Sequence, residues 1–172
     1  MATERAGTDE GADHRALFAL SVAYAAAADA RDGEGLVALF VEDGELVVPR
    51  PPAELRPVTV RSGHDALRQV ADFLGRYHRT FHVVPNARYE LDGDEATGEV
   101  QCVAHHLTAA SSSSEDGGGD GRAGTDTVWF IRYRDRYRRS DSTWKFLRRE
   151  LHLQWVEEHP VALLGPPTEG WD

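Results

Sequence analysis

Asp29 and His82 are the residues of this sequence whose types and positions could do chemistry together. Asp29 continues an apolar stripe at helical spacing, formed by Phe18, Val22 and Ala25. Burial of an unpaired carboxylate costs several kcal/mol, so Asp29 needs a partner, and His82 is the best candidate. A histidine held by an ionised carboxylate is a stronger base in a fixed tautomer and removes protons without a cofactor. The alternative is that Asp29 caps its helix and that a backbone carbonyl satisfies His82.

Further residues could bind or protonate a substrate oxygen. Tyr24 is a workable acid in a dry pocket, although on an ideal helix it lies roughly 140° from Asp29 and is equally typical of a core position. His105 and His106 alternate in a predicted strand, and the pattern does not say which one faces inward. Either histidine could therefore be a second acid or hydrogen-bond donor, or could be exposed near a hairpin end.

Arg149 alternates with leucines and with Trp155 on a largely apolar strand face. A guanidinium on such a face needs an anionic or carbonyl partner. Arg149 therefore either orients a substrate oxygen or forms a structural pair with Asp29 or Glu150. We include Trp155, at the end of the same face, among the substrate-binding candidates.

A row of arginines alternates along 132–138, and in isolation such a row could indicate a nucleic-acid stripe. Tyr133 and Tyr137 are expected on the opposite face, so no aromatic side chain interleaves with the arginines. In an acidic chain this row is more simply a solvated sheet surface or a dimer contact.

The composition restricts the class of protein. The chain has 172 residues and a formal net charge of -10, which disfavours nucleic acid and membrane surfaces as partners. Cys102 is the single cysteine, which excludes an internal disulfide, suits a reducing cytoplasm and is typical of a small core residue. No metal-ligand spacing and no flavin, nicotinamide or haem signature is present, so we expect neither metal nor cofactor. No stretch is long and apolar enough for a membrane span.

Apolar periodicity predicts helices first and an antiparallel meander afterwards, which makes an α+β domain. The Pro-rich segment 49–57 is expected to exclude regular structure. We expect a disordered tail over 1–14, one domain over 15–160 with a mobile Ser/Gly insert at about 110–124, and a second tail over 161–172. The predicted elements are helices over 16–30, 36–40 and from Ser62 or Gly63 to Tyr77, and strands over 45–48, 80–84, 87–91, 97–108, 127–137 and 144–156.

This order of elements resembles the nuclear transport factor 2-like superfamily in its SnoaL-like branch. The resemblance covers about Leu17 to Trp155, and it implies a cone-shaped, strongly bent antiparallel sheet that encloses a pocket with three helices. Members often dimerise through the sheet, so a homodimer is expected. The residues that carry it are Tyr24 to Asp32 with Leu36 and Phe40, Phe81 to Asn86, Asp135 to Tyr137, and Trp144 to Phe146.

The resemblance also implies roles. In scytalone dehydratase and lindane dehydrochlorinase an Asp and a His at the positions of Asp29 and His82 form a proton-abstracting dyad. Bile-acid dehydratase uses a tyrosine that matches Tyr24, scytalone dehydratase has a second histidine at a place similar to His105, and lindane dehydrochlorinase has a pocket arginine that matches Arg149.

We therefore expect a cytoplasmic, cofactor-independent lyase or isomerase of the dehydratase type. Its substrate would be a small, mostly apolar, oxygenated molecule held in the pocket. The alternatives are a noncatalytic ligand-binding or assembly-subunit protein of the same fold, and a polyketide cyclase, because the fold by itself settles no reaction.

Overall fold

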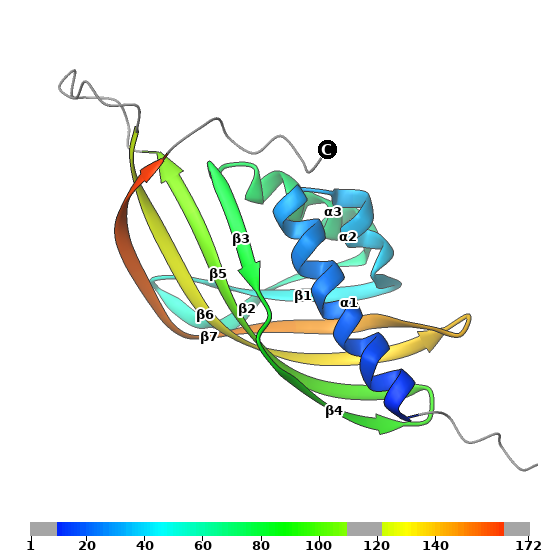
Figure 1. Ribbon diagram of the computed structural model, residues 1–172. Coiled ribbons are helices and arrows are strands. Elements are labelled where there is room, and N and C mark those ends of the chain that lie inside the picture. Colours follow the sequence, from blue (N-terminus) through cyan, green and yellow to red (C-terminus); the bar gives the residue numbers. More distant parts are fainter. Residues whose placement is uncertain (1–9, 110–121, 164–172) are drawn as a thin grey trace, which may run out of the picture.

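The computed structural model describes residues 10–109 and 122–163, and within them three helices pack on one side of a bent seven-stranded sheet (Figure 1). The helices are α1 (Glu10–Ala30), α2 (Gly33–Ala38) and α3 (Gly63–Leu74). The strands are β1 (Phe40–Arg50), β2 (Glu54–Ser62), β3 (Arg79–Val83), β4 (Ala87–Asp92), β5 (Glu95–Ala109), β6 (Arg122–Ser140) and β7 (Thr143–Leu163).

The sheet has the strand order β2-β1-β7-β6-β5-β3, and β4 also pairs with β5. All these pairs are antiparallel except β1 with β7, which is parallel. The long strands β5, β6 and β7 curve around the helices without closing into a barrel (Figure 1). The predicted α+β fold with a strongly bent sheet and three helices is therefore confirmed.

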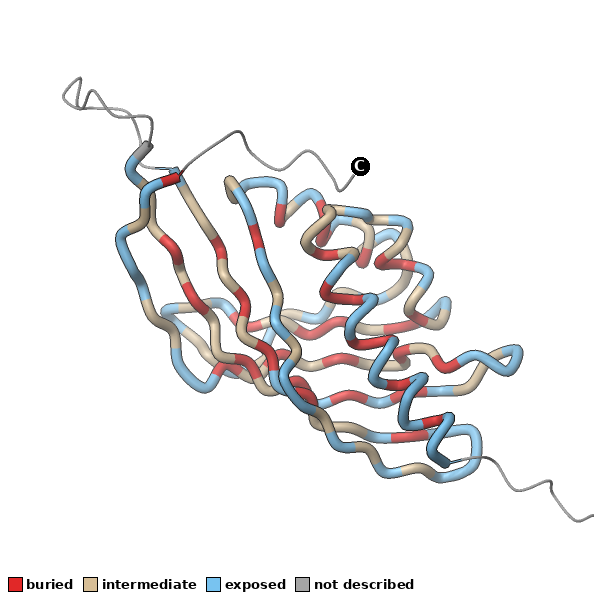
Figure 2. The backbone as a smooth tube through the Cα atoms, in the orientation of Figure 1, coloured by how far each residue is buried: buried red, intermediate tan, exposed pale blue. Residues whose placement is uncertain are grey.

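The core lies between the helices and the concave face of the sheet, where the buried positions of both layers face one another (Figure 2). On α1 the buried face is formed by Leu17, Tyr24 and Ala28, with their neighbours. The apolar stripe that starts at Phe18 and Val22 was the wrong choice, because these side chains are 38% and 44% exposed. Both stripes have helical spacing. The stripe of Leu17, Tyr24 and Ala28 is the one whose side chains pack against the sheet.

The N-terminal boundary was also placed wrongly. Helix α1 begins at Glu10, and its Asp13 accepts hydrogen bonds from Arg139 Nη2 (2.7 Å) and Trp144 Nε1 (2.9 Å). Because these bonds join the first turn of α1 to the hairpin of β6 and β7, residues 10–14 belong to the domain. The rest of the predicted tail, 1–9, lies outside the described residues.

Strand β2 occupies part of the Pro-rich segment, contrary to the expectation of irregular structure. It is an edge strand that pairs only with β1 among the described strands, so the missing N–H of Pro57 can point away from the ladder. Strands β6 and β7 likewise extend over 122–124 and 161–163, which were assigned to the insert and the tail. The remainder of both segments lies outside the described residues.

Tight turns join two pairs of neighbouring strands. Asp92 pairs with Glu95 across the turn between β4 and β5, and Gly93 there has a φ of 61°. Between β6 and β7, Asp141 and Ser142 have φ angles of 49° and 64°, as a two-residue turn of the primed type requires. Among the described helices, none combines the length and the apolar character that crossing a membrane requires.

Candidate active site

The end of α1 and strand β3 bring Asp29 and His82 together. Helix α1 ends at Ala30, one residue after Asp29, and Arg31 follows with a φ of 57°. Strand β3 pairs with β5 so that His82 lies beside Ala104 on the concave face. His82 Nδ1 lies 2.6 Å from Asp29 Oδ1, and the backbone N–H of His82 donates to Asp29 Oδ2 over 2.8 Å. The predicted contact between the two side chains is therefore present.

A third donor completes the surroundings of the carboxylate. Thr80 Oγ1 donates to Asp29 Oδ1 over 2.9 Å, and the side chains of Asp29 and His82 are only 10% and 7% exposed. Burial by itself raises the pKa of the Asp29 carboxyl, but the hydrogen bonds and charge of His82, together with Thr80, bring it below its usual value. Because an ionised carboxylate only accepts, the proton between the two groups is on His82 Nδ1, which leaves the lone pair of Nε2 for chemistry.

His106 is the histidine that shares this face. It pairs with Thr80 in the β3–β5 ladder, and its ring centroid lies 6.0 Å from that of His82. Its Nδ1 lies 3.2 Å from the backbone oxygen of Thr127, which can only accept, so Nδ1 carries the proton and Nε2 is an acceptor. Burial lowers the pKa of His106 to about 4, so the ring is neutral near pH 7. Tyr77 and Trp129 flank the ring, at centroid distances of 4.9 and 4.6 Å.

His105 lies on the opposite face of the sheet, contrary to the expectation that it joins the dyad. Its side chain is 34% exposed, and its Nδ1 contacts Asp126 Oδ2 over 2.6 Å. The signal for choosing His106 was present in the sequence, since His106 alternates with Val100, Cys102 and Ala104, whose small apolar side chains are typical of a core face.

Arg149 is a core residue and lies outside the site, contrary to the expectation of substrate binding. Its side chain is 1% exposed and forms a bidentate pair with Asp135, with distances of 3.0 Å from Nε to Oδ1 and 2.7 Å from Nη2 to Oδ2. Nη2 also donates to Ser21 Oγ, and Tyr137 donates its hydroxyl to Asp135. These partners occupy the guanidinium, so the structural alternative holds, although the partner is neither Asp29 nor Glu150.

Trp155 lies on the convex face and was also assigned wrongly. A β-bulge separates Leu153, which pairs with Ile131, from Trp155, which pairs with Phe130. The extra residue, Gln154, reverses the alternation, so Leu153 points inward and Trp155 points outward. The Trp155 ring is 49% exposed and stacks on Phe130 at a centroid distance of 4.1 Å.

Tyr24 is packed in the aromatic core. Its ring contacts Phe40, Tyr133 and Phe146 at centroid distances of 6.0 to 6.3 Å, and the Arg149 guanidinium lies 4.5 Å from it. Burial raises the pKa of Tyr24 to about 12, which makes the phenol a poor proton donor near pH 7. The core alternative therefore accounts for Tyr24, and the mechanism proposed below does not use it.

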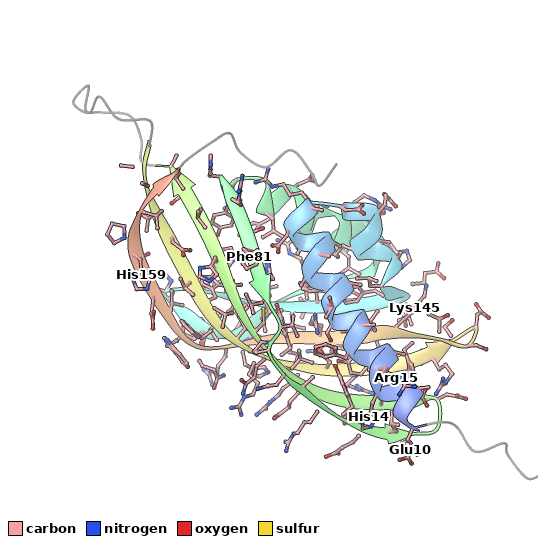
Figure 3. All side chains as sticks on the ribbon, in the orientation of Figure 1. Glu10, His14, Arg15, Phe81, Lys145 and His159 are labelled. Atoms are coloured by element: carbon pink, nitrogen blue, oxygen red, sulfur yellow. The ribbon has the colours of Figure 1, made fainter. Side chains whose placement is uncertain are left out.

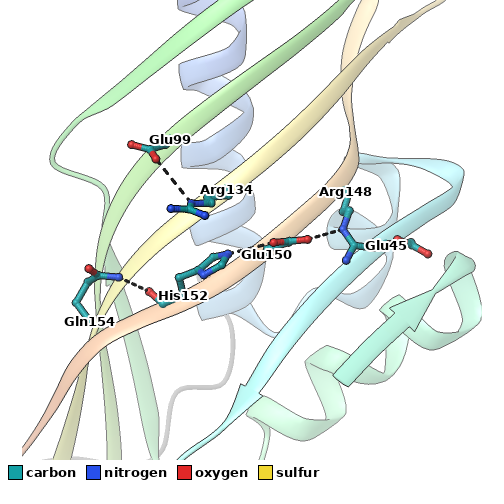
Figure 4. Close-up of polar contacts among 7 residues, drawn as sticks. All are labelled: Glu45, Glu99, Arg134, Arg148, Glu150, His152 and Gln154. Carbon is teal, nitrogen blue, oxygen red and sulfur yellow. Dashed lines mark hydrogen bonds and ion pairs between the residues drawn. The ribbon is translucent and has the colours of Figure 1, made fainter. Parts of the chain in front are cut away.

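Arg134, Arg136 and Arg138 of the arginine row are exposed and Arg132 is half-buried, as expected for a solvated sheet surface, while Tyr133 and Tyr137 are buried in the core. Arg134 lies 3.8 Å from Glu99, and Arg148 Nε donates to Glu150 over 2.7 Å. Figure 4 shows both contacts. Acidic side chains thus lie beside some of the arginines on this face.

The described residues contain no group of three or more His, Cys, Asp or Glu side chains placed to hold a metal ion. Cys102 is buried, and burial raises the pKa of its thiol to about 11. Among the described residues, the imidazoles of His82 and His106 meet on the concave face, with Asp29 behind the first.

A family model and several solved structures match this chain. The model of the SnoaL-like domain family matches residues 9–150. The structure of a protein of unknown function from Mycobacterium tuberculosis is 26% identical in sequence and has a TM-score of 0.66. The match covers 85% of this chain and 74% of that chain.

Two similar structures carry names of enzymes. A protein assigned as a scytalone dehydratase from Novosphingobium aromaticivorans is 24% identical, with a TM-score of 0.67 over 91% of this chain and 94% of that chain. Hexachlorocyclohexane dehydrochlorinase type 3 from Novosphingobium barchaimii is 19% identical, with a TM-score of 0.62 over 93% and 98%. At these identities the likeness establishes the fold alone. Among curated proteins, none matches the chain.

Proposed function

The chain belongs to the SnoaL-like domain family, and on this premise we propose that it is a cofactor-independent lyase or isomerase in which His82 is the general base. Asp29 holds and charge-balances the His82 ring. The single observation that carries the proposal is that the contact between His82 Nδ1 and Asp29 Oδ1 is buried on the concave face of the sheet, where the two side chains are only 7% and 10% exposed. This contact leaves His82 Nε2 with a lone pair, as a general base requires.

The most concrete reaction is the elimination of water from a hydroxy-carbonyl compound. His82 Nε2 removes the proton from the carbon next to the carbonyl, and the electron pair of the C–H bond forms an enolate. The carbon–carbon double bond then forms as the C–O bond to the hydroxyl breaks, and His82 returns its proton to the departing hydroxide as water. Atoms and charges balance without a metal, a redox partner or an external acid.

The surroundings of His82 support a small, mostly apolar, oxygenated substrate. Tyr77 and Trp129 supply aromatic surface beside His106, and the neutral His106 ring offers Nε2 as an acceptor for a substrate hydroxyl. Isomerisation uses the same proton-moving groups and differs only in where the proton returns. The names of the two similar enzymes, a dehydratase and a dehydrochlorinase, favour elimination.

The proposal is tested by following deuterium exchange and turnover of hydroxy-carbonyl compounds by NMR in D2O. His82→Ala should abolish both, because no other described base shares the contact with Asp29. His105→Ala is the matched control, since it removes an imidazole with a carboxylate partner from the opposite face. Exchange that persists in His82→Ala contradicts the assignment. Tight binding of such compounds without exchange in the native protein would favour the noncatalytic ligand-binding alternative.

A further inference from the structure

Thr80 is a buried polar residue at the candidate site that the mechanism above does not use. It lies two residues before His82 on β3, so both side chains project from the same face of the strand. The residue is 4% exposed, and its hydroxyl donates to Asp29 Oδ1 over 2.9 Å. A buried hydroxyl needs a hydrogen-bond partner, and here that partner is the carboxylate of the dyad.

We propose that Thr80 is a positioning residue of the Asp29–His82 pair, whose hydroxyl fixes the carboxylate in the orientation that faces His82 Nδ1. The inference deepens the proposed function and rests on it. Thr80 does not touch the substrate in this assignment, and it acts only through Asp29.

The division of donors between the two carboxylate oxygens supports the inference. Oδ2 receives the backbone N–H of His82 at 2.8 Å, while Oδ1 receives both the Thr80 hydroxyl at 2.9 Å and His82 Nδ1 at 2.6 Å. One donor on Oδ2 and two on Oδ1 fix the plane of the carboxylate. Without Thr80, Oδ1 would be held only by the imidazole, which is the group that the carboxylate has to orient.

Thr80 also helps to keep the carboxylate ionised. Burial raises the pKa of Asp29, and the bonds from His82 and Thr80 together reverse that effect. Removal of the Thr80 hydroxyl takes away one of these bonds while the burial remains. The pKa of Asp29 is therefore expected to rise in a variant that keeps the shape of threonine without its hydroxyl.

A purely structural role makes a different prediction. If Thr80 only joined β3 to the end of α1, its loss would lower the free energy of unfolding and raise the pKa of Asp29, but it would leave the ring of His82 unchanged. The signal of the His82 ring therefore separates the two roles without any substrate.

The experiment uses the full chain with carbon-13 in the aspartate carboxyls and nitrogen-15 in the histidine rings. Thr80→Val removes the hydroxyl, Thr80→Ser keeps it, and Thr108→Val is the matched control, because the Thr108 hydroxyl bonds to the backbone oxygen of Thr125 (3.4 Å) and not to Asp29. We expect the pKa of Asp29 to rise in Thr80→Val, to return toward the native value in Thr80→Ser, and to be unchanged in Thr108→Val. The His82 Nδ1 proton signal should change in the first variant alone.

With a hydroxy-carbonyl substrate that the native protein turns over, Thr80→Val should lower kcat by about tenfold at unchanged KM. A tenfold loss is the size expected when one hydrogen bond to a charged group is removed. Thr80→Ala takes its place if the valine variant does not fold. A His82 ring signal that stays native in a folded Thr80→Val variant would overturn the inference. A changed ring signal in a protein that turns over no substrate would leave the positioning intact and refute the proposed function alone.

Discussion

Replacement of Asp29 by asparagine (Asp29→Asn) should reverse the tautomer of His82, because of the donors that surround the carboxylate. The backbone N–H of His82 can only donate, so the single side-chain oxygen of the introduced asparagine has to take the place of Oδ2. The amide NH2 then takes the place of Oδ1 and faces His82 Nδ1, 2.6 Å away in the native protein. His82 Nδ1 is forced to accept, and its proton moves to Nε2.

The size of the effect follows from this geometry. A proton on Nε2 removes the lone pair that the proposed mechanism needs, and in a comparable catalytic triad the same Asp-to-Asn change costs about 10⁴ in kcat. The fold should survive, because the three hydrogen bonds of the carboxylate are replaced by weaker bonds to a neutral amide. A loss of about 1–3 kcal/mol in the free energy of unfolding is expected for a partner lost from a buried charged group.

Nitrogen-15 NMR of the histidine rings measures the tautomer directly, and the same samples give the exchange rate of hydroxy-carbonyl compounds in D2O. Asp126→Asn is the control, because it makes the same change beside His105 on the convex face. If His82 keeps its proton on Nδ1 in Asp29→Asn, or if exchange falls equally in both variants, the orientation argument is refuted.

Three further predictions concern stability and assembly. Arg149→Leu should lower the free energy of unfolding by about 3–5 kcal/mol in urea titrations, because Asp135 would stay buried and unpaired. Burial lowers the pKa of His106 from 6.5 to about 4, so the unfolded chain binds its proton more tightly. As pH falls from 6.5 to 4 this group should cost about 3 kcal/mol of stability, a slope that His106→Gln removes. We propose that the protein forms a homodimer through the convex face, where Phe81 (Figure 3) and Trp155 are 53% and 49% exposed. Phe81→Glu should then yield monomers in analytical sedimentation. A native protein that sediments as a monomer would contradict the homodimer.

The pairing of Asp29 with His82 could be predicted because it needs no knowledge of strand register. A carboxylate near a helix end has to find a donor, and a β-strand shortly after α3 offered one. Thr80 was missed although it alternates with His82, because the sequence does not show that both residues meet the same helix end. The order of elements was predictable for the same reason, since apolar periodicity is a local property.

The errors at Trp155 and Arg149 have a different cause. An alternating pattern assigns faces only while each residue of one strand opposes one residue of the next, and the bulge at Gln154 breaks that condition. For Arg149 the partner is Asp135, which the β6–β7 register places directly opposite it. A charge pair between neighbouring strands depends on a register that no single strand contains.

The two His–Asp pairs His82–Asp29 and His105–Asp126 show why contact geometry alone does not define an active site. They have the same 2.6 Å separation, and their histidines lie on neighbouring strands but on opposite faces of the sheet. The His82 side chain is 7% exposed and the His105 side chain 34%. At the His105–Asp126 pair, water screens the charge of the carboxylate and competes for hydrogen bonds to the imidazole ring. The His82–Asp29 pair lies in a less polar setting, where the carboxylate interacts more strongly with the ring. Burial, and not distance, therefore selects Asp29 and His82, and a substrate processed at His105 would contradict that criterion.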